Sequence, residues 1–323
     1  MPGAFVRLRR GVSRLLRGRT DGRFRATWRV VLPILLAFVG TAVFGLLIAR
    51  TTDAGPLGRT VSGHLATAVA VTGVLFLSAR ALDDRSVTDY GLDIDRGWAR
   101  EFAGGAALGT AMVGATAVIG YLAGWVRVVD TVSSGDAGSL APWLALFVVG
   151  WLCVGYWEEV LFRGIFVTNA VEGLSARSLS PRAALAGGWL ASTVVFGVIH
   201  VPFGNVPGQA HPVTTLAFWV LMGGLLGLGY VLTGRLALPI GLHAAFDLAA
   251  NNVFYAAPAD GVLLPTLVRS EIVARGLMNP IAGIPGVVVV LCGYGVLAGW
   301  CYLGGRDPDA PRPGTPGRSR AAD

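Results

Sequence analysis

Ionisable side chains are concentrated in three strongly apolar stretches of this sequence. They are Glu158, Glu159 and Arg163 in the first stretch, His200 in the second, and His243 and Asp247 in the third. An ionisable group inside a membrane span costs about 2.5 to 3.5 kcal/mol on insertion scales, so such groups are functional candidates. One of them alone is often a packing group, whereas six on three segments favour a site.

The spacing of these residues along helices indicates how they pair. Glu159 and Arg163 are four residues apart and share a helix face, which predicts a mainly structural ion pair. Glu158 points about 100° away from that face, so it is free to face a cavity. His243 and Asp247 are also four residues apart, so the carboxylate is expected to orient the imidazole. One carboxylate and two imidazoles are therefore expected to converge.

The elements that carry these residues are predicted to be transmembrane helices. Of the 323 residues, 54% are apolar and only 14% are charged, which is too apolar for a soluble domain of this length. Runs of about 20 apolar residues are long enough to cross a bilayer as helices. The fold class is therefore expected to be all-α, a polytopic membrane protein of about eight transmembrane helices. The predicted spans are Val30–Ile48, Val61–Ala79, Phe102–Val126, Leu140–Val167, Ala183–Val201, Thr214–Leu232, Leu236–Tyr255 and Ile284–Leu303.

Arginine placement predicts how the chain is oriented in the cell membrane. All 26 basic residues are arginine, and twenty of them lie on one side of the predicted spans, five on the other and one within a span. By the positive-inside rule, both termini are expected in the cytoplasm. Residues 1–27 then form a basic cytoplasmic segment, residues 28–304 the transmembrane domain and residues 305–323 a disordered cytoplasmic tail.

The net charge of +7 is expected to reflect contact with anionic lipid of the bilayer. The sequence contains no nucleic-acid-binding motif, so no nucleic-acid partner is expected. The oligomeric state is not indicated by any pattern in the sequence.

Three motifs in this order resemble the CAAX protease and bacteriocin-processing family of intramembrane endopeptidases, also called the Abi family. The matching residues are Glu158, Glu159 and Arg163 for Glu-Glu-x-x-x-Arg, Phe196 and His200 for Phe-x-x-x-His, and His243 and Asp247 for His-x-x-x-Asn or Asp. The resemblance covers about residues 85–255. It implies an enzyme that hydrolyses a peptide or membrane-protein substrate, as a CAAX prenyl protease does.

The resemblance also implies a role for each residue of the cluster. Glu158 would be the base that activates water, His200 would hold that water, and His243 would assist at the oxyanion. Asp247 completes the catalytic set at a position where the family often has Asn, and an amide can donate to an oxyanion whereas an ionised carboxylate cannot. The residues expected to support these four are Glu159, Arg163, Phe196 and Asn251.

Metal dependence is left open by the residue types. Glu158, His200 and His243 could also bind Zn²⁺, as in metalloproteases with two His ligands and one Glu. Because these residues come from separate helices and no H-E-x-x-H motif is present, a glutamate mechanism without a cofactor is favoured, with Zn²⁺ as the alternative.

The depth of the site imposes a condition on the helix that carries His200. His200 lies near the end of its predicted span, whereas His243 lies two turns into its own. Their convergence requires irregular backbone over residues 201–208 at mid-membrane, which is tolerated where it lines a wet cavity.

Two other functions fit a buried polar cluster. One is a scaffold or bacteriocin-immunity-type membrane protein that uses the cluster only for packing, and the other is a proton-coupled transporter. His64 and His211 lie outside the cluster and are not expected to take part.

Overall fold

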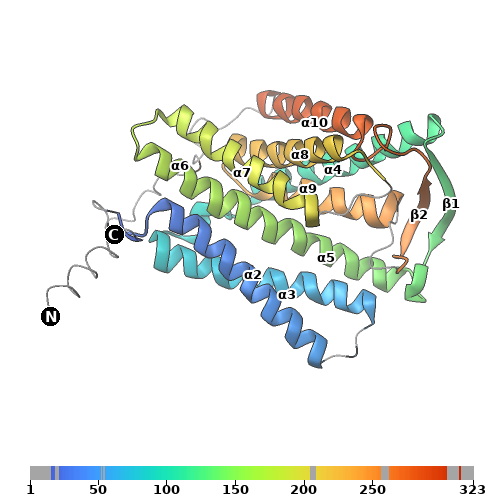
Figure 1. Cartoon of the computed structure of the whole chain (residues 1–323), viewed down its shortest axis with the longest axis horizontal. Helices are drawn as coiled ribbons and strands as arrows, with labels where there is room; N and C mark the ends of the chain where they lie inside the picture. The colour runs from blue at the N-terminus through green and yellow to red at the C-terminus, as the bar shows by residue number, and fades with distance from the viewer. Residues whose placement is uncertain are drawn as a thin grey trace.

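The computed structural model of the chain describes residues 16–18, 22–51, 53, 55–203, 209–255, 262–303 and 313. Long helices form a bundle, with a small two-stranded sheet at one end (Figure 1). The described helices are α2 (Ala26–Thr51), α3 (Pro56–Leu77), α4 (Arg96–Leu122), α5 (Ala141–Glu159), α6 (Thr168–Ser175), α7 (Pro181–Phe203), α8 (Pro212–Thr233), α9 (Ala237–Leu248) and α10 (Ile284–Leu303). Most of the predicted basic segment 1–27 and of the predicted tail 305–323 lies outside the described residues.

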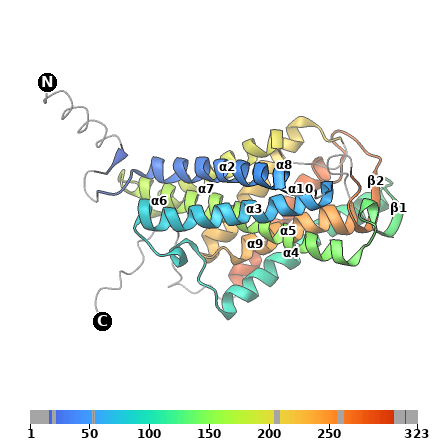
Figure 2. The same ribbon diagram turned by 90° about the horizontal axis from the view of Figure 1, so that it is seen from below.

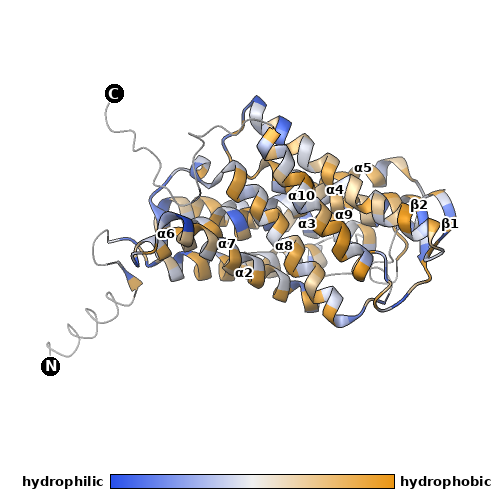
Figure 3. Ribbon diagram, turned by 90° about the horizontal axis from the view of Figure 1, so that it is seen from above, coloured by the Kyte–Doolittle hydropathy of each residue, from blue (hydrophilic) through white to orange (hydrophobic). Residues whose placement is uncertain are grey.

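Seven helical segments of the described chain are long and apolar enough to cross a membrane. They are Ala26–Thr51, Pro56–Asp83, Arg96–Leu122, Ala141–Ser175, Pro181–Pro202, Pro212–Thr233 and Ile284–Leu303. The expected all-α polytopic fold is thereby confirmed. Large apolar side chains such as Phe38, Val39 and Leu46 are more than half exposed on α2, as expected for a surface that faces lipid. In Figure 3, apolar residues line the long helices and hydrophilic residues collect toward the ends of the bundle.

One of the eight predicted spans, Leu236–Tyr255, differs from the other seven. Its α-helix, α9, has only 12 residues and continues as a π-helical segment, Ala249–Phe254. The segment runs alongside α4 in the same direction, because a Cβ on Gly105 would meet the carbonyl of Leu238 and one on Gly109 would meet that of Leu242. α9 therefore passes through the bundle between other helices, although it is not among the seven apolar segments.

The arrangement of α9 and α10 places the start of α2 and the end of α10 at the same end of the bundle (Figure 1). α10 is antiparallel to α4, because Trp300 packs near Gly104 and Pro280 near Gly120. With α9 and its extension counted as a pass, the described helices cross the bundle an even number of times.

A two-stranded antiparallel sheet lies at the opposite end of the bundle, formed by β1 (Val126–Ser133) and β2 (Thr266–Ile272). The pairing of the two strands has a bulge between Val128 and Asp130. Arg127 of β1 forms an ion pair with Glu271, its partner on β2. This sheet is absent from the sequence predictions, in which Val126 ends a helix.

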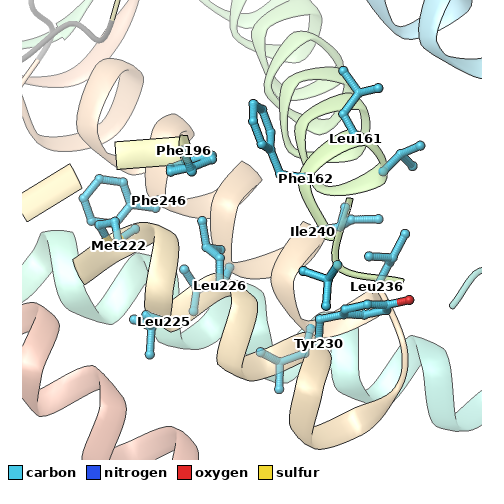
Figure 4. Packing of buried hydrophobic residues seen from close by; sticks show 14 of the residues in the cluster. Leu161, Phe162, Phe196, Met222, Leu225, Leu226, Tyr230, Leu236, Ile240 and Phe246 are labelled. Atoms are coloured by element: carbon cyan, nitrogen blue, oxygen red, sulfur yellow. The ribbon is translucent and has the colours of Figure 1, made fainter. Parts of the chain in front are cut away.

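The core lies where α8 and α9 meet the middle of α5 and α7. Leu225 and Leu226 of α8 are fully buried and belong to one apolar cluster with Phe196 of α7 and Phe246 of α9 (Figure 4). Helices α2 and α3 pack side by side against α5 and its continuation (Figure 2). These two helices therefore cover one side of the segment that carries the glutamates.

Candidate active site

Three helices bring the predicted catalytic residues together. Glu158 is in the last turn of α5, and its Oε2 lies 3.3 Å from Nε2 of His200 on α7 and 3.8 Å from Nε2 of His243 on α9. Nε2 of His243 also lies 3.5 Å from Oδ2 of Asp247. These four side chains are at most 20% exposed, so the cluster is inside the bundle.

The chain departs from regular α-helix directly after the glutamates. Val160–Val167 is a π-helical segment that joins α5 to α6. A π-helical turn contains more residues than an α-helical turn, and such turns are frequent at functional sites. The change of pitch decides the faces on which the side chains after Glu159 lie, including that of Arg163.

His200 is held by its own helix and by two aromatic rings. Its Nδ1 lies 2.8 Å from the carbonyl oxygen of Phe196. A carbonyl oxygen only accepts, so Nδ1 carries the proton and Nε2 faces Glu158. The imidazole stacks on Phe196 at 4.0 Å between ring centroids and contacts Trp219 of α8 at 4.7 Å.

His243 is oriented by a residue of another helix. Its Nδ1 lies 2.8 Å from Oε1 of Glu159 on α5. Because a carboxylate accepts, Nδ1 of His243 donates this hydrogen bond, which leaves Nε2 directed at Glu158 and Asp247. The sequence predicted only the contact within α9 to Asp247, and the stronger support from Glu159 comes from tertiary packing.

The predicted ion pair of Glu159 and Arg163 is confirmed. Nη1 of Arg163 lies 2.9 Å from Oε1 of Glu159, and both side chains are fully buried. Nη2 of Arg163 donates to the carbonyl of Gly223 on α8 at 2.9 Å, and the guanidinium lies over the Phe196 ring at 4.2 Å. Arg163 therefore contacts Glu159, which bonds His243, and Phe196, which contacts His200.

A cavity of about 260 Å³ lies against this cluster. Two ionisable residues, Glu158 and His200, form part of its wall. The rest of the wall is formed by Ile34, Ala37, Phe38, Thr41, Thr67, Val71, Trp157, Leu161, Phe162 and Ile199. Oε2 of Glu158 is buried and makes no hydrogen bond of good geometry with another described residue. A water or substrate atom in the cavity would supply its missing partner.

The helical segments that carry His200 and Asp247 both continue beyond these residues. Asn251 donates to the backbone carbonyl of Asp247 at 2.8 Å, so its amide stabilises its own helix. The expectation of irregular backbone from Val201 onward is wrong for its first three residues, because α7 continues to Phe203 with Pro202 in its last turn. Residues 204–208 lie outside the described chain.

Trp219 of α8 lies beside the cluster and is absent from the sequence predictions. Trp219 covers the face of His200, and no motif marks it. His64 of α3 packs against Trp151 of α5 at 5.2 Å between ring centroids, and its Nε2 is buried without a hydrogen-bond partner among the described residues. His211 caps the start of α8 and is away from the cluster, as expected.

A metal at this site receives no support from the arrangement of the donors. Glu158, His200 and His243 are residue types that bind Zn²⁺. Among the residues that the structure describes, however, no group of three or more His, Cys, Asp or Glu side chains has the arrangement of a metal site.

The family scan matches residues 140–249 to the model described as "Type II CAAX prenyl endopeptidase Rce1-like". This part runs from the start of α5 to the end of α9 and contains all four residues of the cluster. The resemblance of the chain to the CAAX protease family is thereby confirmed, and it implies a membrane protease. Neither a curated protein nor a solved structure matches the chain.

Proposed function

We propose that this protein is an intramembrane endopeptidase in which Glu158 activates the water that attacks the peptide bond. One observation supports this most directly: a buried carboxylate on a cavity wall lies within 3.8 Å of two imidazole Nε2 atoms. A base within reach of one shared water is the geometric requirement for this chemistry. The family match of residues 140–249 supports the same reaction class.

In the proposed reaction, Glu158 removes a proton from water as the water oxygen attacks the scissile carbonyl carbon. Nε2 of His200 accepts a hydrogen bond from the second O–H of that water and so fixes the orientation of the water, since Nδ1 carries the imidazole proton. The protonated Glu158 then gives its proton to the leaving nitrogen as the carbon–nitrogen bond breaks. Protons balance, because the one taken from water leaves with the amine.

His243 is proposed to stabilise the oxyanion that forms on the substrate carbonyl. Its Nδ1 donates to Glu159, and an imidazolium at this position would donate to the oxyanion from Nε2. Asp247, on the same helix face, would stabilise that positive charge electrostatically. The substrate is proposed to be a peptide or a segment of a membrane protein that enters the apolar cavity.

The direct test replaces Glu158 with Gln, which keeps the shape of the side chain and removes its basicity. Loss of a positioned base lowers the rate by about 10² to 10⁴-fold, so cleavage of a peptide substrate should fall by that amount while thermal unfolding stays unchanged. Glu101→Gln is the matched control, because it neutralises a half-buried glutamate of α4 away from the cavity. Equal activity of the parent and Glu158→Gln would exclude this role and favour a scaffold.

Chelation separates the two hydrolytic mechanisms. Activity is expected to persist after prolonged treatment with EDTA, because the proposed reaction uses side chains only. Loss of cleavage with EDTA and its recovery with Zn²⁺ would instead assign Glu158, His200 and His243 as metal ligands.

A further inference from the structure

Trp157, the neighbour of Glu158 in α5, has a buried indole N–H. Its Nε1 has no hydrogen-bond partner among the described residues. The indole forms part of the wall of the cavity of about 260 Å³ that Glu158 also lines. A buried donor without an acceptor is unfavourable, and in native proteins it usually marks a partner that is still to be supplied. The cavity beside the indole is the space in which an acceptor for this N–H can lie.

The wall of this cavity offers few other hydrogen-bond donors. Backbone N–H groups within helices donate to carbonyl groups of the same helix. The hydroxyl of Thr67 and Nδ1 of His200 also donate to backbone carbonyls of their own helices, at 2.9 and 2.8 Å. An ionised Glu158 only accepts. Among the described wall residues, the Trp157 indole and the Thr41 hydroxyl are therefore the side-chain donors that remain for a bound molecule.

A peptide that enters this cavity needs such a donor. Its carbonyl oxygens lose their hydration in an apolar space, and each one that stays unsatisfied is costly. A carboxylate would match the wall less well, because the ionisable residues there are Glu158 and His200 and no arginine is among the described wall residues. The chemistry of the wall therefore suits a neutral backbone carbonyl.

We propose that Trp157 binds the substrate, with its indole N–H donating to a backbone carbonyl oxygen of the peptide beside the scissile bond. Trp157 and Glu158 are consecutive in α5, so their side chains leave the helix about 100° apart, and both line the cavity. One peptide can thus contact the indole while its scissile carbonyl faces Glu158. This role rests on the proposed endopeptidase function and adds a residue that takes no part in the proton transfers.

The test measures the Kd of a fluorescein-labelled copy of the peptide used in the Glu158 cleavage test, by fluorescence anisotropy with the full chain in detergent. Every protein compared carries Glu158→Gln, so that the peptide stays intact. Trp157→Phe keeps an aromatic ring and removes the N–H, which leaves a peptide carbonyl without its donor and should weaken binding about 5- to 100-fold. Trp98→Phe is the matched control, because Nε1 of Trp98 is also buried without a partner among the described residues but lies on α4, outside the cavity wall.

Two further comparisons separate the N–H from the shape of the indole. β-(3-Benzothienyl)alanine at position 157 keeps both rings and lacks the N–H, so it should bind the peptide as weakly as Trp157→Phe does, with an unchanged Tm. Thioamides placed one at a time at the two amides that flank the scissile bond should weaken binding at one position, because sulfur is a poor acceptor. That loss should disappear in Trp157→Phe, as in a double-mutant cycle.

The proposal is overturned if Trp157→Phe binds the peptide as the protein with Trp157 does, or if Trp98→Phe loses as much affinity. It is also overturned if benzothienylalanine retains full affinity, or if the thioamide loss persists in Trp157→Phe. Cleavage of the peptide by Glu158→Gln would overturn the role of Glu158 alone, because Trp157→Phe is then still judged by its KM.

Discussion

At the scale of single residues, Glu159 connects the buried ion pair with Arg163 to His243, the residue proposed to stabilise the oxyanion. Its Oε1 accepts from Arg163 and from His243 at 2.9 and 2.8 Å. The pair predicted from helix spacing thus has a third member on another helix. A change at Arg163 is therefore expected to reach His243 through Glu159, in addition to its direct effect on stability.

Arg163→Ala is expected to destabilise the protein strongly. Removing one partner of a buried ion pair leaves an uncompensated charge and costs about 3 to 5 kcal/mol. Loss of the bond to Gly223 adds to this cost. Yield of inserted protein and the unfolding midpoint provide the measurement, with the exposed Arg182→Ala as the control. If Arg163→Ala accumulates as well as the parent, the pair has no structural role.

Asp247→Asn is expected to keep activity within about tenfold of the parent. The amide is close to the same size, removes one carboxylate near Glu158 and can donate to an oxyanion. Steady-state kcat for Asp247→Asn and Asp247→Ala gives the comparison, and the alanine variant should be the slower. A collapse of kcat in Asp247→Asn to the level of Glu158→Gln would mean that the carboxylate itself is required.

At the scale of elements, the position of His243 depends on how closely α9 approaches α4. A Cβ on Gly105 would lie 2.1 Å from the carbonyl oxygen of Leu238, and one on Gly109 would lie 2.3 Å from that of Leu242. Glycine at these positions lets two helix backbones meet, as is common between membrane helices. The short helix that carries His243 is therefore held by backbone contact.

Gly109→Ala should move α9 and impair both stability and activity. Overpacking typically costs about 1 to 3 kcal/mol, and a displacement of about 1 Å at reacting groups costs about 10²-fold in rate. Gly114→Ala on the same helix is the matched control, because its nearest neighbour is the Phe254 side chain at 3.6 Å. Unfolding midpoints and kcat should separate the two variants. Equal behaviour would mean that α4 and α9 can adjust to an added methyl group.

At the scale of the whole molecule, the short α9 decides how many times the chain crosses the helix bundle. Counted alone, the seven apolar segments of the described chain would put the two ends of the bundle on opposite sides. The start of α2 and the end of α10 nevertheless lie at the same end, because α9 and its π-helical extension make a further pass (Figure 1).

Reporter fusions are expected to place both termini in the cytoplasm and Ser134, beside β1, on the opposite side. The basis is the even number of passes together with the arginine asymmetry. Fusions after Asp323 and insertions at Ser134 should therefore give opposite signals. A reporter at Asp323 that is active outside the cell would contradict this topology.

The class of protein and the residues of the cluster could be predicted from the sequence because they depend on local properties. Apolar run length marks the spans, and the cost of burying charge marks Glu158, His200 and His243 as candidates. The contact of Glu159 with Arg163 was predicted from their spacing of four residues.

Other features were decided by tertiary structure. The bond from His243 to Glu159 depends on how α5 and α9 are rotated against each other. Lipid-facing and core-facing side chains of a membrane helix are both apolar, so the sequence pattern does not reveal these rotations. For the same reason, only packing placed Ala37 of α2 and Val71 of α3 on the wall of the Glu158 cavity.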